Sequence, residues 1–88
     1  MKGKPKFDRI VNEAILEVVE NQLRNGDPPE TRQTYERLVK SGYSDEEARD
    51  LIGCVVVSEL LDVVKNHRPY DHERYVAALK RLPTLPWE

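Results

Sequence analysis

The stretch that decides the fold runs from Ser44 to Val64 and reads SDEEARDLIGCVVVSELLDVV. Its first four residues form a capping box, in which the Ser44 hydroxyl accepts from the Glu47 amide and the Glu47 carboxylate accepts from the Ser44 amide. The residues that follow are apolar on nearly every side of the expected helix. Because such a helix is stable only when other helices surround it, we predict that this segment, ending near Asn66, is the central helix of a small bundle.

The flanking sequence predicts three shorter helices with apolar faces at helical spacing. The expected N-caps are Asp8, Asp27 and Asp71, and Gly26 is the expected stop of the first helix. The three helices span about residues 8–24, 28–40 and 71–82. Short loops favour adjacent, roughly antiparallel neighbours. We therefore expect an all-α four-helix bundle over residues 8–82, a flexible basic arm over residues 1–7 and an extended tail over residues 83–88.

Composition narrows the class of protein. A length of 88 residues suits one domain. The 14 Lys and Arg residues against 16 Asp and Glu residues make nucleic-acid binding an unfavoured hypothesis, since such binders usually carry a basic excess. A single Cys excludes an internal disulfide framework and favours a reducing, cytoplasmic setting. We see no secretory signal, and no apolar stretch approaches the ~20 residues of a membrane span.

Glu59 is the carboxylate that interrupts the apolar stripe of the long helix. At about 100° per residue it falls between Ile52 and Val55 on the helix surface. A buried carboxylate without a partner is strongly unfavourable. We therefore expect Glu59 to pair with an Arg, a Tyr, an Asn or a backbone amide, or to be partly exposed; a role as a ligand for a metal or small molecule is the alternative.

His67 and His72 lie in the polar turn before the last helix, which extends to Tyr75. Imidazole and carboxylate groups are zinc ligands, so Glu59, His67 and His72 are candidate metal ligands. The two His residues flank a helix start rather than sharing one helix face, and an ordinary polar turn is the simpler interpretation. Cys54 has no neighbouring cation that would lower its thiol pKa, so we expect it to pack in the core. No motif predicts a catalytic residue or a cofactor.

Three apolar residues are the candidate interface. Val57 and Leu61 lie on the long helix where we expect the shorter helices to leave it uncovered, as also at Val64, and Trp87 lies in the tail. Uncovered apolar surface of this kind is typical of a protein interface. The sequence thus favours a small binding or assembly module that self-associates or docks on a protein. The alternative is a ligand- or metal-binding protein, enzymes included, centred on Glu59 and the turn from His67 to Tyr75.

The chain also resembles a family of small bacterial helical proteins that is known as a domain of unknown function. The resemblance spans about Ile10 to Pro83. It is carried by ENQL at 20–23, PPET at 28–31, YERL at 35–38, GYSDEEA at 42–48 and IG at 52–53. It implies a helical fold and no catalytic residue; some members carry His in the first helix, where this chain has Asn12. Residues 38–48 are also similar to the loop and following helix of ubiquitin-associated domains, where that loop binds proteins.

Overall fold

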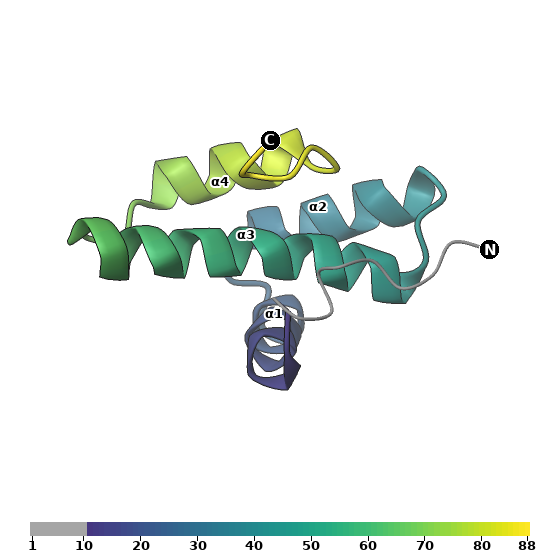
Figure 1. Ribbon diagram of the computed structural model, residues 1–88. Coiled ribbons are helices and arrows are strands. Elements are labelled where there is room, and N and C mark those ends of the chain that lie inside the picture. The colour runs from purple at the N-terminus through teal and green to yellow at the C-terminus, as the bar shows by residue number, and fades with distance from the viewer. Residues whose placement is uncertain (1–10) are drawn as a thin grey trace.

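The computed structural model describes residues 11–88, and these residues form four helices without a strand (Figure 1). The helices are α1 (Glu13–Asn25), α2 (Pro29–Lys40), α3 (Asp45–Asn66) and α4 (His72–Arg81). The 22 residues of α3 make it the longest helix, and the other three pack around it. The expected all-α class with a long third helix is confirmed. The expected arm of residues 1–7 lies outside the described residues.

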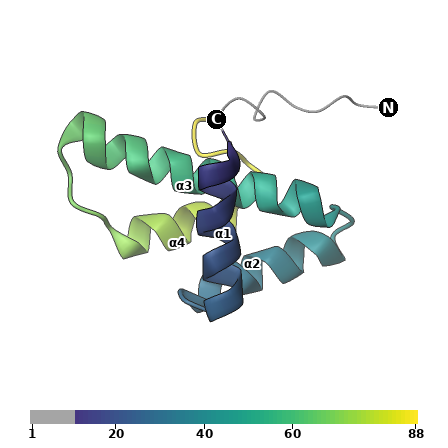
Figure 2. The same ribbon diagram turned by 90° about the horizontal axis from the view of Figure 1, so that it is seen from below.

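α3 separates two layers of helices. α2 and α4 lie on one side of it, α2 beside its N-terminal half and α4 beside its C-terminal half, while α1 lies on the other side (Figures 1 and 2). Figure 2 shows that α1 crosses α3 instead of running alongside it. The expectation of roughly antiparallel neighbours is therefore wrong for α1.

The crossing of α1 over α3 depends on Gly53. A Cβ atom placed on Gly53 would lie 2.6 Å from Cγ1 of Val11 and 3.3 Å from Cγ2 of Ile15. A Cβ atom at this position therefore has no room unless the side chain of Val11 moves. A glycine inside a helix lowers its stability by about 1 kcal/mol relative to alanine, and here the close approach of α1 offsets that loss.

All four helices contribute to one apolar core. Its fully or almost fully buried members include Val19 of α1, Leu38 of α2, Ile52 and Val55 of α3, and Leu79 of α4. Most of the α3 contribution comes from residues 48–56, where the helix has neighbours on both sides. The C-terminal half of α3 contributes fewer buried side chains.

The helix ends follow the sequence signals in part. The capping box of Ser44 and Glu47 is present, and Asp71 caps α4 by accepting from the Arg74 amide. α1 begins at Glu13, later than predicted, and its N-cap is Asn12, which accepts from the amide of the third helical residue. The predicted cap, Asp8, lies outside the described residues. Asp27 does not cap α2 either: that helix begins at Pro29, and Pro28 occupies the N-cap position without a side-chain hydrogen bond.

The C-terminal tail forms turns instead of running fully extended. The Thr84 amide donates to the Arg81 carbonyl at 2.9 Å, and the Glu88 amide donates to the Leu85 carbonyl at 3.0 Å. Leu85 packs against the core, whereas Trp87 remains 51% exposed. The tail therefore turns back at the end of α4 (Figure 1) and adds one apolar residue to the core.

An arginine on α3 joins three helices through polar contacts. Arg49 donates to Glu20 of α1 and, at 2.9 Å, to Oδ1 of Asp45. The same Asp45 oxygen also accepts a hydrogen bond from the Tyr35 hydroxyl of α2. These contacts lower the pKa of two carboxyl groups. The Arg49 hydrogen bond is the main cause at Glu20, and the Tyr35 hydrogen bond is the main cause at Asp45.

Candidate functional site

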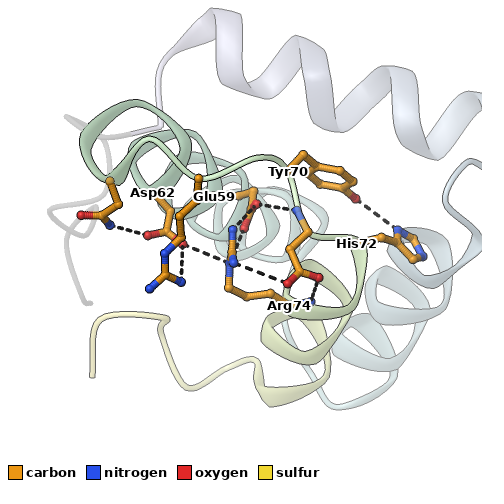
Figure 3. A network of polar contacts seen from close by, with 8 residues as sticks. Glu59, Asp62, Tyr70, His72 and Arg74 are labelled. Atoms are coloured by element: carbon orange, nitrogen blue, oxygen red, sulfur yellow. Dashed lines mark hydrogen bonds and ion pairs between the residues drawn. The ribbon is translucent and has the colours of Figure 1, made fainter.

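Glu59 is buried and paired, as the first of the two alternatives expected. Its side chain is close to 10% exposed. Arg74 of α4 donates from Nε to Oε1 at 3.2 Å and from Nη2 to Oε2 at 2.8 Å, and the Asp71 amide donates to Oε2 at 3.2 Å (Figure 3). A two-pronged arginine–carboxylate contact is among the stronger polar interactions in proteins. Glu59 therefore connects α3 to the start of α4.

Two further carboxylates surround the same guanidinium group. Nε of Arg74 lies 3.0 Å from Oδ2 of Asp62, and its Nη1 lies 3.5 Å from Oδ2 of Asp71. Figure 3 shows Glu59 and Asp62 of α3 beside Arg74, and the contact of Asp71 adds a third carboxylate from the α3–α4 loop. The hydrogen bond to Glu59 is the main cause of a raised Arg74 pKa. Both oxygens of Glu59 therefore accept hydrogen bonds from α4 and from the loop that precedes it.

A small pocket lies beside this ion-pair cluster, between α3, α4 and the tail. Its volume is about 230 Å³, and its polar lining includes Ser58, Asp62, Arg74 and Arg81, with Pro86 closing one side. Small-molecule sites typically measure about 300–1,000 Å³. The pocket is below that range, and the charges of Arg74 and its carboxylate partners already compensate one another.

The structure does not bring the two histidines to Glu59. His67 ends α3 in the left-handed conformation, with φ at 53°. His72 opens α4, and its Nδ1 lies 3.1 Å from the Tyr70 hydroxyl, on the far side of that ring from Glu59 (Figure 3). Within residues 11–88, no cluster of three His, Cys, Asp or Glu residues has the arrangement of a metal site. Glu59, His67 and His72, the three candidate metal ligands, therefore do not come together at one place.

Cys54 lies in the core, as expected. Its side chain is fully buried, and burial together with the charge of Asp50 raises the thiol pKa to about 12. The nucleophilic form of cysteine is the thiolate. Burial therefore disfavours the thiolate form of Cys54 in the folded protein.

The most prominent surface feature is an apolar stripe on the C-terminal half of α3. It consists of Val57, Leu60, Leu61 and Val64, and we call it the α3 stripe. Val57 is half-buried, and the exposed fractions of the other three are 49%, 53% and 69%. Their spacing puts them on one side of the helix. The sequence predicted Val57 and Leu61; Leu60 was missed, although its spacing from both residues could have indicated it.

The α3 stripe is exposed because neither layer of helices reaches it. α1 crosses α3 at Gly53, one turn before the stripe begins. α4 packs on the opposite side of α3, where Glu59 meets Arg74. The C-terminal half of α3 therefore extends beyond α1 with one side uncovered (Figure 1).

Trp87 does not belong to this surface. Its neighbour Pro86 lines the pocket between α3 and α4, on the side of α3 that faces away from the stripe. Trp87 is half exposed there. The three predicted interface residues thus fall in two places, with Val57 and Leu61 together and Trp87 apart.

No protein-family model, curated protein or solved structure matches this chain. The resemblances to the small bacterial family and to ubiquitin-associated domains therefore stay predictions. Among the helices of residues 11–88, none has both the length and the apolar character needed to cross a membrane.

Proposed function

We propose that this chain is a small helical assembly module that self-associates through the α3 stripe. The observation that supports the proposal is the row of apolar side chains at Val57, Leu60, Leu61 and Val64, of which the last three are about half exposed or more. Contiguous exposed apolar surface on a small protein is typical of an interaction site.

The contacts of Glu59 disfavour the alternative of a ligand- or metal-binding site. That alternative needs Glu59 to face His67 or His72 across a cavity. Glu59 instead accepts hydrogen bonds from Arg74 and from the Asp71 amide. The polar cluster is therefore an internal support of the fold, and the α3 stripe is the better candidate for function.

The setting we propose is the bacterial cytoplasm. The cytoplasmic part follows from the single Cys, which is typical of proteins in a reducing compartment. The bacterial part follows from the resemblance to the small bacterial family. The nearly balanced charge of -2 favours a protein partner over nucleic acid.

The proposal is tested by measuring molecular mass over a range of protein concentrations, by sedimentation equilibrium and by native mass spectrometry. We expect wild-type protein to form dimers or larger species. Leu61→Gln should weaken the association at least 10-fold, because it places a polar amide in the centre of the interface. Val39→Gln is the matched control, since Val39 is 41% exposed on another helix.

A wild-type protein that remains monomeric at every concentration would overturn the proposal. Equal weakening by Leu61→Gln and Val39→Gln would also contradict it, because the effect would then not depend on the α3 stripe. Circular dichroism of both variants checks that they remain folded.

A further inference from the structure

We propose that the pocket between α3, α4 and the tail binds a short-chain carboxylate, and that Arg81 holds the carboxylate group of this ligand. The pocket lies on the side of α3 that faces away from the α3 stripe, so the proposal does not depend on self-association. It also differs from a ligand site centred on Glu59, because Glu59 keeps its contacts with Arg74 and with the Asp71 amide.

The charged side chains that line the pocket are unequally paired. Glu59 and Asp62 each contact Arg74, with N–O distances of 2.8 Å and 3.0 Å. Arg81 lines the same pocket, and within residues 11–88 its guanidinium group has no hydrogen bond or ion pair. Both carboxylates of the lining therefore have a cationic partner, whereas the positive charge of Arg81 has none.

Arg81 is free although it ends a helix. A basic side chain in the last turn of a helix commonly donates to the last carbonyl groups. At the end of α4 these carbonyls accept from α2 instead, because Arg37 donates to the Leu82 carbonyl at 2.9 Å and to the Leu79 carbonyl at 3.0 Å. The helix end therefore does not need Arg81, which is left available to a ligand.

The lining of the pocket changes in character along α4. Arg74 and its carboxylate partners form one end. Arg81 lies about 10 Å further along the helix, where the chain turns into the tail (Figure 1). The apolar part of the lining consists of Val55, Ala77, Ala78 and Pro86. A positive group beside an apolar wall is complementary to a carboxylate that carries a hydrocarbon chain.

Ser58 of α3 supplies a second hydrogen-bond donor. Its side chain is half-buried in the lining, and its hydroxyl has no hydrogen-bond partner within residues 11–88. The planar guanidinium group of Arg81 matches a carboxylate through two parallel hydrogen bonds. One unpaired cation also suits a single negative charge better than the higher charge of a phosphate group.

The size of the pocket limits the length of the ligand. Its volume of about 230 Å³ is below the usual range for drug-sized molecules. The small side chains of Ala77 and Ala78 leave room for a chain but not for a ring system. We therefore assign the pocket to linear carboxylates of about four or five carbon atoms, for which pentanoate is the test compound.

Titration of the protein with pentanoate, followed by nuclear magnetic resonance of the backbone amides, tests the proposal. We expect saturable shifts of the Ser58, Ala77 and Ala78 amides, with a dissociation constant of about 1 mM. Pentanamide has the same shape without the charge. It should bind about 10-fold more weakly, because it cannot form the charged contact with Arg81.

Three variants separate the charge from the space. Arg81→Gln should weaken pentanoate binding about 10-fold. Ala77→Leu keeps Arg81 and fills the pocket, so it should have a similar effect; Ala77 is exposed on α4, and leucine suits a helix. Lys80→Gln is the matched control, since Lys80 is an exposed neighbouring cation outside the pocket lining. It should leave the affinity unchanged.

Each opposite result would overturn the assignment. Amide shifts that do not saturate with pentanoate would mean that the pocket is not a binding site. Equal weakening by Arg81→Gln and Lys80→Gln, or equal binding of pentanamide, would mean that no specific contact with Arg81 exists. Full binding by Ala77→Leu would place the ligand outside the pocket. None of these results bears on self-association through the α3 stripe, which is measured separately.

Discussion

At the scale of single residues, the contact between Glu59 and Arg74 is expected to stabilise the fold. Glu59→Gln keeps the shape of the side chain and removes its charge, so Arg74 loses its best-aligned acceptor. We expect the free energy of unfolding to fall by about 1–3 kcal/mol. Urea denaturation followed by circular dichroism measures this change.

A double-mutant cycle assigns that loss to the pair. Arg74→Gln should also destabilise the protein, and Glu59→Gln should have a smaller effect once Arg74 is absent. Glu36→Gln on the surface of α2 is the matched control. An unchanged melting temperature for Glu59→Gln would mean that the contact contributes nothing to stability.

Gly53 is the second residue with a measurable role. Gly53→Ala puts a Cβ 2.6 Å from Val11, which forces α1 away from α3. Overpacking of this kind lowers stability by about 1–3 kcal/mol, and the better helix propensity of alanine recovers up to about 1 kcal/mol. We expect a net loss of about 1–2 kcal/mol in urea denaturation.

Removing the obstructing side chain should reverse that effect. Val11→Ala deletes both Cγ atoms that the new Cβ would meet. It should destabilise the wild-type protein but have little effect, or a favourable one, in the Gly53→Ala background. Strictly additive losses would show that the two positions are not in contact.

At the scale of elements, the end of α3 departs from the usual residue preference. His67 occupies the left-handed position that glycine usually fills at a helix end. His67→Gly should therefore raise the free energy of unfolding by about 1 kcal/mol. His72→Gly is the contrasting variant, because it puts a glycine in the first turn of α4 and should lower stability by about 0.5–1 kcal/mol. Thermal melts compare the two, and a loss of stability in His67→Gly would refute the interpretation.

At the scale of the whole molecule, the contacts of Arg49 predict how stability depends on acid. The pKa values of Glu20 and Asp45 are lowered in the folded protein. Their contribution is complete above the pKa of about 4 that these groups have in the unfolded chain. It is lost as the pH falls through the lower folded values. We therefore expect the melting temperature to decline below about pH 4.

Arg49→Gln tests the cause of that decline. Without the guanidinium group the two carboxyl groups should titrate closer to their ordinary pKa values, so the melting temperature should depend less on pH between 4 and 2. Lys40→Gln removes an exposed charge at the end of α2 and should leave the dependence unchanged. Parallel curves for wild type and Arg49→Gln would contradict the prediction.

Part of the fold could be predicted because it depends on neighbours in the chain. The capping box at Ser44 and the cap at Asp71 were predicted correctly, since a cap involves residues three apart. The start of α1 was not, because Asp8 and Asn12 are both suitable caps and the local pattern does not rank them. The pairing of Glu59 was predicted as a need for a donor. That the donor is Arg74, 15 residues further along the chain, depends on how α3 and α4 pack.

Local sequence patterns predict a helical fold whose longest helix runs from Ser44 to Asn66 and lies at the centre. Hydrogen bonds within each helix and the 3.6-residue repeat of apolar side chains are sufficient for that. Only the tertiary structure decided that α1 crosses α3 and leaves the α3 stripe uncovered. The physical reason is that the crossing depends on contact between Gly53 and Val11, which are far apart in the chain and meet only after the helices have packed.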